Sequence, residues 1–327
     1  MQTIRLTGLD AQDPLAFLAA LGSLLAATEQ CRAAKRAAPT MSFTTGATFE
    51  PAIHGSFEGS EDLLDSLDRD RAAFADPSHP DPFLSFSYKD AKGNEVYDLK
   101  PLPEEFQKFA QAQIDTSTAD NRRTLDWAAA TLTDVAKDNN GNSKPFALHF
   151  TAGNQRFLTI ARELLYGAGK TKAQRAVDRE DLADAVFGPW PNNRHLKVFN
   201  WSPVQDRPYA LRAIDPAKDP KRGNPGADWL ALRGVAMMSS APVGTKIVTS
   251  GVHGQWKSAD FSYPVWTHPL DVDAITMLLR HPGVRRKIDG HSSTTSRTLP
   301  SGVRVLTCRI SRTDQGGYGS FSRPSHS

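Results

Sequence analysis

An apolar segment close to the start of the chain constrains the fold most. Asp13 followed by Pro14 is a typical helix start, because the aspartate side chain accepts hydrogen bonds from free backbone N–H groups and proline has none to leave unpaired. The leucines that follow share one helical stripe, and they are Leu15, Leu18, Leu21, Leu24 and Leu25. Alanine fills most of the other positions, so the sequence predicts a core helix that packs closely on two sides.

The same segment is too short to cross a membrane. Its apolar stretch ends at Ala27, is interrupted by Gly22 and Ser23, and falls short of the roughly 20 residues that span a bilayer. The residues before it do not show the basic and then apolar pattern of a secretion signal. We therefore expect a soluble, cytoplasmic protein that makes no membrane contact.

Shorter patterns along the rest of the chain predict a mixed architecture. Apolar residues at helical spacing predict further helices at residues 61–74, 121–137, 154–166, 179–187, 227–238 and 269–281. Alternating segments predict short strands at residues 4–6, 83–88, 95–97, 146–150, 246–250 and 302–310. The expected fold class is therefore α+β, with mixed helices and short antiparallel strands.

Charge divides the chain into two regions. Residues 1–150 carry 14 Lys and Arg against 22 Asp and Glu, a net charge of −8. Residues 151–327 carry 25 Lys and Arg against 14 Asp and Glu, a net charge of +11. A polar loop at residues 138–145 coincides with this change, and any boundary between two subdomains is expected there. The predicted regions are an acidic α+β region over 1–140, a basic, aromatic-rich α+β region over 141–312, and a flexible, disordered C-terminal tail over 313–327.

A region this basic favours a polyanionic partner, because phosphates offset the mutual repulsion of its cations. Tryptophans and tyrosines lie among these cations, and single-stranded nucleic acid is held by cationic grooves whose aromatic faces contribute about 1–3 kcal/mol per stacked base. Arginine also matches phosphate oxygens with paired N–H donors. The candidate nucleic-acid-binding residues are Lys170, Lys172, Arg175, Arg194, Lys197, Arg207, Lys221, Arg222, Trp256, Lys257, Arg285, Arg286 and Lys287.

Catalytic and cofactor motifs are weaker than this charge pattern. Gly167–Thr171 resembles part of a phosphate loop, but Leu164 stands where the motif requires its first glycine, so we expect a helix end followed by a basic loop. Cys31 and Cys308 are too few to form a zinc cluster or a disulfide framework. The carboxylates lie on helix faces of the acidic half, which is typical of solvated surfaces. We therefore expect no metal and no cofactor.

Two other functions remain open. His253 lies beside glycines and close to Trp256 and Lys257 in the sequence, and a metal-independent endoribonuclease could use it, or His268, as a general acid or base. Alternatively, the protein is a structural subunit whose basic half docks onto an acidic protein, or onto its own acidic half, without any nucleic-acid contact.

Three segments resemble the large-subunit proteins of type I-G (formerly I-U) CRISPR effector complexes. They are DPLAFLAALGSLL at residues 13–25, ADWLALRGV at residues 227–235 followed by SAP, and FSYPVW at residues 261–266 followed by Pro269 and Leu270. The resemblance implies a non-catalytic subunit of an RNA-guided antiviral complex. Such a subunit contacts crRNA or target DNA and other effector subunits, and it leaves cleavage to a separate helicase-nuclease. The resemblance assigns no role to an individual residue.

Overall fold

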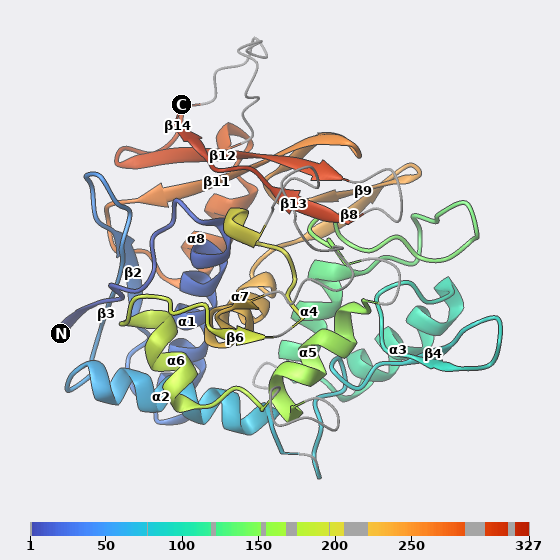
Figure 1. Cartoon of the computed structure of the whole chain (residues 1–327), viewed down its shortest axis with the longest axis horizontal. Helices are drawn as coiled ribbons and strands as arrows, with labels where there is room; N and C mark the ends of the chain where they lie inside the picture. Colours follow the sequence, from blue (N-terminus) through green and yellow to red (C-terminus); the bar gives the residue numbers. More distant parts are fainter. Residues whose placement is uncertain are drawn as a thin grey trace.

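The computed structural model describes residues 2–76, 78–118, 122–151, 155–167, 175–195, 197–205, 222–284, 298–312 and 318–326. The fold is a mixed α+β fold, as the sequence predicts (Figure 1). Its α-helices are α1 (Pro14–Ala33), α2 (Ser60–Phe74), α3 (Pro103–Thr116), α4 (Arg123–Thr131), α5 (Phe157–Tyr166), α6 (Arg179–Val186), α7 (Pro225–Val235) and α8 (Val272–Arg280).

The strands are short, and all their pairings in the described residues are antiparallel. They are β1 (Gln2–Arg5), β2 (Thr40–Phe43), β3 (Pro51–Gly55), β4 (Tyr88–Lys89), β5 (Glu95–Val96), β6 (Arg194–His195), β7 (Arg222–Gly223), β8 (Ser240–Val243), β9 (Lys246–Thr249), β10 (Val252–Gln255), β11 (Ser258–Trp266), β12 (Val303–Arg312), β13 (Gly319–Phe321) and β14 (Ser325–His326).

Helices α1 and α7 form the centre of the fold. The Asp13 side chain accepts a hydrogen bond from the Leu15 backbone nitrogen at 2.9 Å, which begins α1 where the sequence predicts. Asn224 caps α7 in the same way. The two helix backbones touch at Gly22 and Gly234, because a side chain at either position would overlap the other helix. This close approach needs glycine on both helices, and it explains the glycine inside the apolar stripe.

Helix α1 is long and apolar enough to cross a membrane by length and composition alone, but most of it is buried within the fold. Its apolar surface is covered by protein on several sides, which is the arrangement of a core helix. The helix continues to Ala33, beyond the apolar stretch that ends at Ala27.

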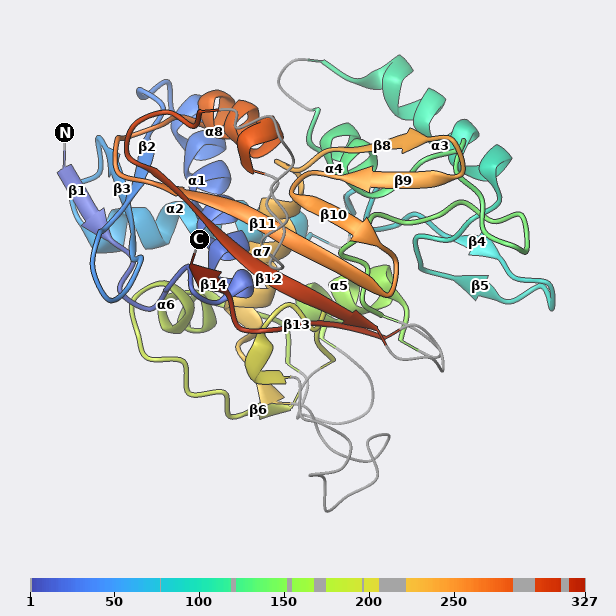
Figure 2. The same ribbon diagram turned by 90° about the horizontal axis from the view of Figure 1, so that it is seen from above.

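A sheet in the order β10–β11–β12–β13 lies across the α1–α7 pair, with β14 also paired to β12 (Figure 2). Two contacts fix it there. The rings of Phe17 on α1 and Tyr263 on β11 stack with centroids 4.4 Å apart, and the Tyr263 hydroxyl donates to the Ala11 carbonyl oxygen at 2.8 Å. A smaller sheet, in the order β1–β3–β2, packs beside it, and Trp266 donates to the Met41 carbonyl oxygen at 2.7 Å.

A buried ion cluster joins α7 to α2 and α1. Arg233 is fully buried and donates to both carboxylate oxygens of Asp70, at 2.9 and 3.1 Å, and to Glu29 at 2.8 Å. The rings of Phe74 and Trp127 lie 4.6 and 5.3 Å from its guanidinium carbon. One arginine therefore pairs with carboxylates from two other helices, which keeps the buried Asp70 and Arg233 charges from being unpaired, a costly arrangement in a core.

The structure differs from the sequence predictions in three segments. Residues 146–150 form no strand, because Phe146 and His149 donate to the carbonyl oxygens of Thr131 and Phe146. The Gly319 N–H group of β13 donates to the Phe150 carbonyl oxygen at 3.2 Å, but this bond does not continue into a strand ladder. The helix predicted at 121–137 ends at Thr131. The predicted disordered tail is ordered over residues 318–326, where β13 and β14 pair with β12.

Buried side chains from both sides of the polar loop at 138–145 belong to one hydrophobic cluster. The division into an acidic and a basic region therefore describes the charge of the chain, and as a division of the fold it stays a prediction.

Candidate functional site

The β10–β11 hairpin presents an exposed tryptophan. Gln255 pairs with Ser258, so Trp256 and Lys257 form the two-residue turn between the strands. The Trp256 side chain is 53% exposed. The other tryptophans of the chain are buried or half-buried, and they are Trp127, Trp190, Trp201, Trp229 and Trp266. Of the tryptophans in the basic region, Trp256 alone is thus placed to meet a partner.

Arg312, at the end of β12, supports the Trp256 ring from the protein side. Its guanidinium carbon lies 3.6 Å from the centre of the indole ring and 5.1 Å from the centre of the Phe150 ring. The guanidinium also donates to the carbonyl oxygens of His149, at 3.1 Å, and Ala147. Burial lowers the pKa of Arg312 to about 10, so the group still carries its charge at neutral pH. The cation holds the ring in place without covering its exposed part.

A polar row crosses the same sheet next to the hairpin. His253 on β10 is opposite Asp260 on β11, which is opposite Arg309 on β12. The His253 Nε2 atom lies 4.0 Å from an Asp260 carboxylate oxygen, and both side chains are 14% exposed. This distance is too long for a hydrogen bond, and the His253 Nδ1 atom lies 3.3 Å from the Gly251 carbonyl oxygen, so the pair is only part of a general acid–base arrangement. No second acid or base of defined geometry accompanies them in the described residues. His268 follows β11 beside Gly302, away from this row.

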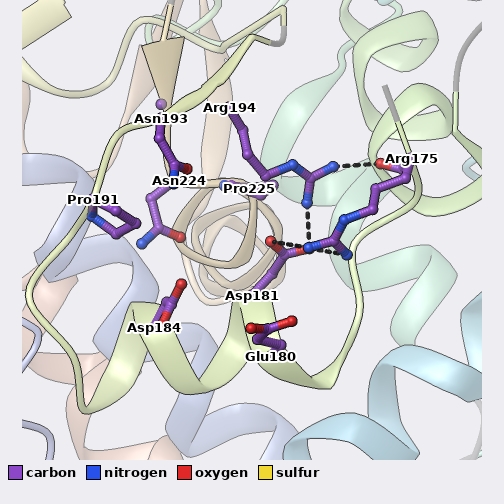
Figure 3. Close-up of a pocket in the computed structure, with 10 residues that line it drawn as sticks. Arg175, Glu180, Asp181, Asp184, Pro191, Asn193, Arg194, Asn224 and Pro225 are labelled. Carbon is purple, nitrogen blue, oxygen red and sulfur yellow. Dashed lines mark hydrogen bonds and ion pairs between the residues drawn. The ribbon is translucent and has the colours of Figure 1, made fainter. Parts of the chain in front are cut away.

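A second set of predicted residues meets at a cleft between α6 and the start of α7 (Figure 3). Arg175 and Arg194 both bind the buried carboxylate of Asp181, and Arg194 also donates to the Arg175 carbonyl oxygen. Lys197 lines the adjoining pocket but pairs with Glu163 at 2.5 Å. The structure therefore brings three predicted cations together, and carboxylates of the same chain already compensate each of them.

The remaining predicted residues fall into two groups. Arg222 is exposed on β7, which pairs with β6 beside the cleft. The others lie outside the described residues, and they are Lys170, Lys172, Arg207, Lys221, Arg285, Arg286 and Lys287.

Sequence reasoning missed two residues that shape these sites. The sequence did not single out Arg312, because its contact with Trp256 depends on how β11 and β12 pair. Asn224 was missed although its position before Pro225 is a recognisable helix-cap signal. In the described part of the chain, no three His, Cys, Asp or Glu side chains converge as metal ligands would.

Comparison with protein-family models, with curated proteins and with solved structures finds no match for this chain.

Proposed function

We propose that this protein is a non-catalytic, nucleic-acid-binding subunit of a CRISPR type I effector complex, and that the β10–β11 hairpin contacts single-stranded nucleic acid. The observation that carries the binding proposal is Trp256, which is half-exposed at a hairpin turn and backed by the Arg312 guanidinium. Its partners in the complex are crRNA or target DNA and other effector subunits.

The hairpin offers the two interactions that hold an unpaired strand. An exposed indole face stacks a base with about 1–3 kcal/mol, and it does so for any sequence because every base has a flat face. Lys257, the other turn residue, adds a positive charge beside the ring for the backbone phosphate. Arg312, whose guanidinium also lies over the Phe150 ring, holds the indole from the protein side, so little side-chain entropy is lost when a base arrives.

The assignment to an effector complex rests on the three resembling segments, which occupy α1, α7 and β11. These elements pack directly on one another through Gly22 and Gly234 and through Phe17 and Tyr263. The resemblance thus concerns residues that build the core. Similar core residues indicate a similar fold, but they do not indicate a similar binding site. The surface that meets nucleic acid must be tested separately.

The test measures binding of a fluorescently labelled single-stranded oligonucleotide, as RNA and as DNA, by anisotropy at low salt. We expect Trp256→Ala to weaken binding by roughly 5- to 150-fold, from the loss of one stacked base, and Trp256→Phe to retain most of the affinity. Met277→Ala, at an exposed apolar residue on α8, is the control and should bind as the unaltered protein does. Equal affinities for Trp256→Ala and Met277→Ala would rule out the hairpin contact. Absence of any binding, alone or with partner subunits, would rule out the function.

A metal-independent endoribonuclease is the second candidate, because Asp260 lies within 4.0 Å of His253 on the same sheet face. This reading predicts RNA cleavage in the presence of EDTA that His253→Ala abolishes and His268→Ala preserves. Intact RNA after long incubation with the purified protein would rule out the endoribonuclease.

A further inference from the structure

The cleft between α6 and α7 is open to the surface and has the size of a small molecule. Its volume is about 440 Å³, within the range of roughly 300–1,000 Å³ that is typical of ligand sites. Glu180, Asp181 and Asp184 of α6 form one wall, and Pro191 to Arg194 with the start of α7 form the other. Gly226 lets α7 press against the α6 backbone, since a Cβ there would lie 3.0 Å from the Leu182 nitrogen.

One wall offers hydrogen-bond acceptors that none of the described residues uses. Asp181 is occupied by Arg175 and Arg194, but Glu180 and Asp184 have no hydrogen-bond or ion-pair partner among the described residues. Figure 3 shows the Asp184 carboxylate pointing away from α6 toward Asn224. A ligand in this cleft would therefore bring N–H groups to that wall.

The opposite wall offers a donor to which no described residue is bonded. Asn224 is only 3% exposed, and its Oδ1 atom accepts from the Ala227 backbone nitrogen at 3.0 Å as the cap of α7. This fixed role leaves its Nδ2 atom as the free end, and that atom has no partner in the described residues. In Figure 3 the Nδ2 atom points toward the space between Pro191 and Asp184. A buried, unpaired N–H group of this kind is destabilising unless a ligand accepts from it.

These two walls together select the ligand chemistry. A phosphate alone would meet the free carboxylates of Glu180 and Asp184, and a simple cation or a lysine side chain would leave Asn224 without an acceptor. A guanine base carries adjacent N–H donors, N1–H and N2–H₂, and the acceptors O6 and N7 on one flat ring.

We propose that this cleft binds a guanine nucleotide, with the base between Asp184 and Asn224. The site is separate from the Trp256 hairpin and does not depend on the strand binding proposed there. The nucleotide can be free or can be one residue of a longer strand, and the guanine edge that the cleft reads is the same.

Calorimetric titration of the full chain with GMP, AMP, CMP and UMP tests the proposal. We expect GMP to bind at least ten-fold more tightly than UMP, which lacks the exocyclic amino group. Asp184→Asn and Asn224→Ser should each weaken GMP binding roughly ten-fold or more. Serine still caps the helix but has no amide N–H, so Asn224→Ser keeps α7 intact.

Matched controls separate recognition from folding. Glu104→Gln, at an exposed carboxylate on α3, and Asn94→Ser, in the β4–β5 turn, should leave GMP affinity unchanged. Inorganic phosphate and spermidine serve as probes for a plain anion or cation site. Equal affinity for all four nucleotides, tighter binding of spermidine than of GMP, or no loss in Asp184→Asn would overturn the proposal. Because Trp256→Ala leaves this cleft intact, that variant should bind GMP normally even if the hairpin contact is disproved.

Discussion

Gly22 of α1 and Gly234 of α7 bring two helix backbones into direct contact, since a Cβ atom on Gly22 would lie 2.8 Å from the Gly234 nitrogen. Gly22→Ala adds a methyl group where only backbone can move, and overpacking of this kind costs about 1–3 kcal/mol. We expect the free energy of unfolding, measured by urea denaturation, to fall by that amount. Gly59→Ala, where a Cβ meets open space, is the control, and an equal change in both variants would contradict the close contact.

The buried Arg233 cluster should be the most sensitive polar group in the core. Arg233→Met leaves Asp70 buried without its cation, and breaking such a pair costs about 3–5 kcal/mol. Asp70→Asn combined with Arg233→Met should recover part of that loss, because the stranded charge is then removed. Arg5→Ala breaks an exposed pair with Glu50 and should change stability by no more than about 1 kcal/mol. A double variant as unstable as Arg233→Met would show that packing, not charge, dominates.

Stability should fall as pH rises through neutrality because of Asp228. Burial raises the pKa of its carboxyl from 3.8 to about 8, and the nearby Asp13 adds to the rise. The folded chain therefore holds a proton that the unfolded chain has released, so the contribution of Asp228 is full below about pH 4 and is lost by about pH 8. Burial also raises the pKa of Asp13, to about 6, so its share is lost at lower pH.

Asp228→Asn isolates this effect. Between pH 6 and pH 8 the unaltered protein should lose about 2 kcal/mol more stability than the variant, a value that follows from one proton over that interval. Urea denaturation of both proteins at pH 6, 7 and 8 provides the comparison. Parallel pH profiles would mean that Asp228 is ionised in the folded chain.

Lys257 should influence how strongly salt weakens strand binding. If the side chain contacts one phosphate, Lys257→Ala reduces the slope of log affinity against log salt by about 0.7. Lys92→Ala, an exposed lysine in the β4–β5 turn, should leave the slope unchanged. An unchanged slope in Lys257→Ala would place the phosphates elsewhere.

The sequence predicts the elements whose signals are local. Asp13, Pro14 and the leucine stripe place the start of α1 correctly, because a cap and a periodicity act within a few residues. Residues 146–150 were predicted as a strand from their alternating apolar residues, but Phe146 bonds to Thr131 and Ala147 bonds to the Thr249 side chain. The one bond from Gly319 of β13 to Phe150 does not extend into a strand ladder among the described residues. Alternating apolar residues indicate which side chains are buried, but a strand also requires a ladder of backbone hydrogen bonds to a neighbouring strand.

Some residues of the candidate site could likewise be predicted from the sequence, and others could not. Trp256 could be found by its residue type and its neighbouring lysine, but Arg312 could not, since only the pairing of β11 with β12 brings it there. Arg175 and Arg194 were expected to bind phosphate, yet both form ion pairs with the Asp181 carboxylate. Charge counted along a chain does not reveal which opposite charges fold against it.

The contact between Tyr263 and Ala11 joins residues 252 positions apart. It can form only after the ribosome has synthesised the chain as far as Tyr263. At roughly 5–20 residues per second, α1 leaves the ribosome roughly 10–50 seconds before the strand that covers it exists. For most of that interval its leucine stripe has no partner from α7, and it has none from β11 until the interval ends. We therefore expect the nascent chain, rather than the finished protein, to be the form that depends on chaperones, with α1 as the segment they hold.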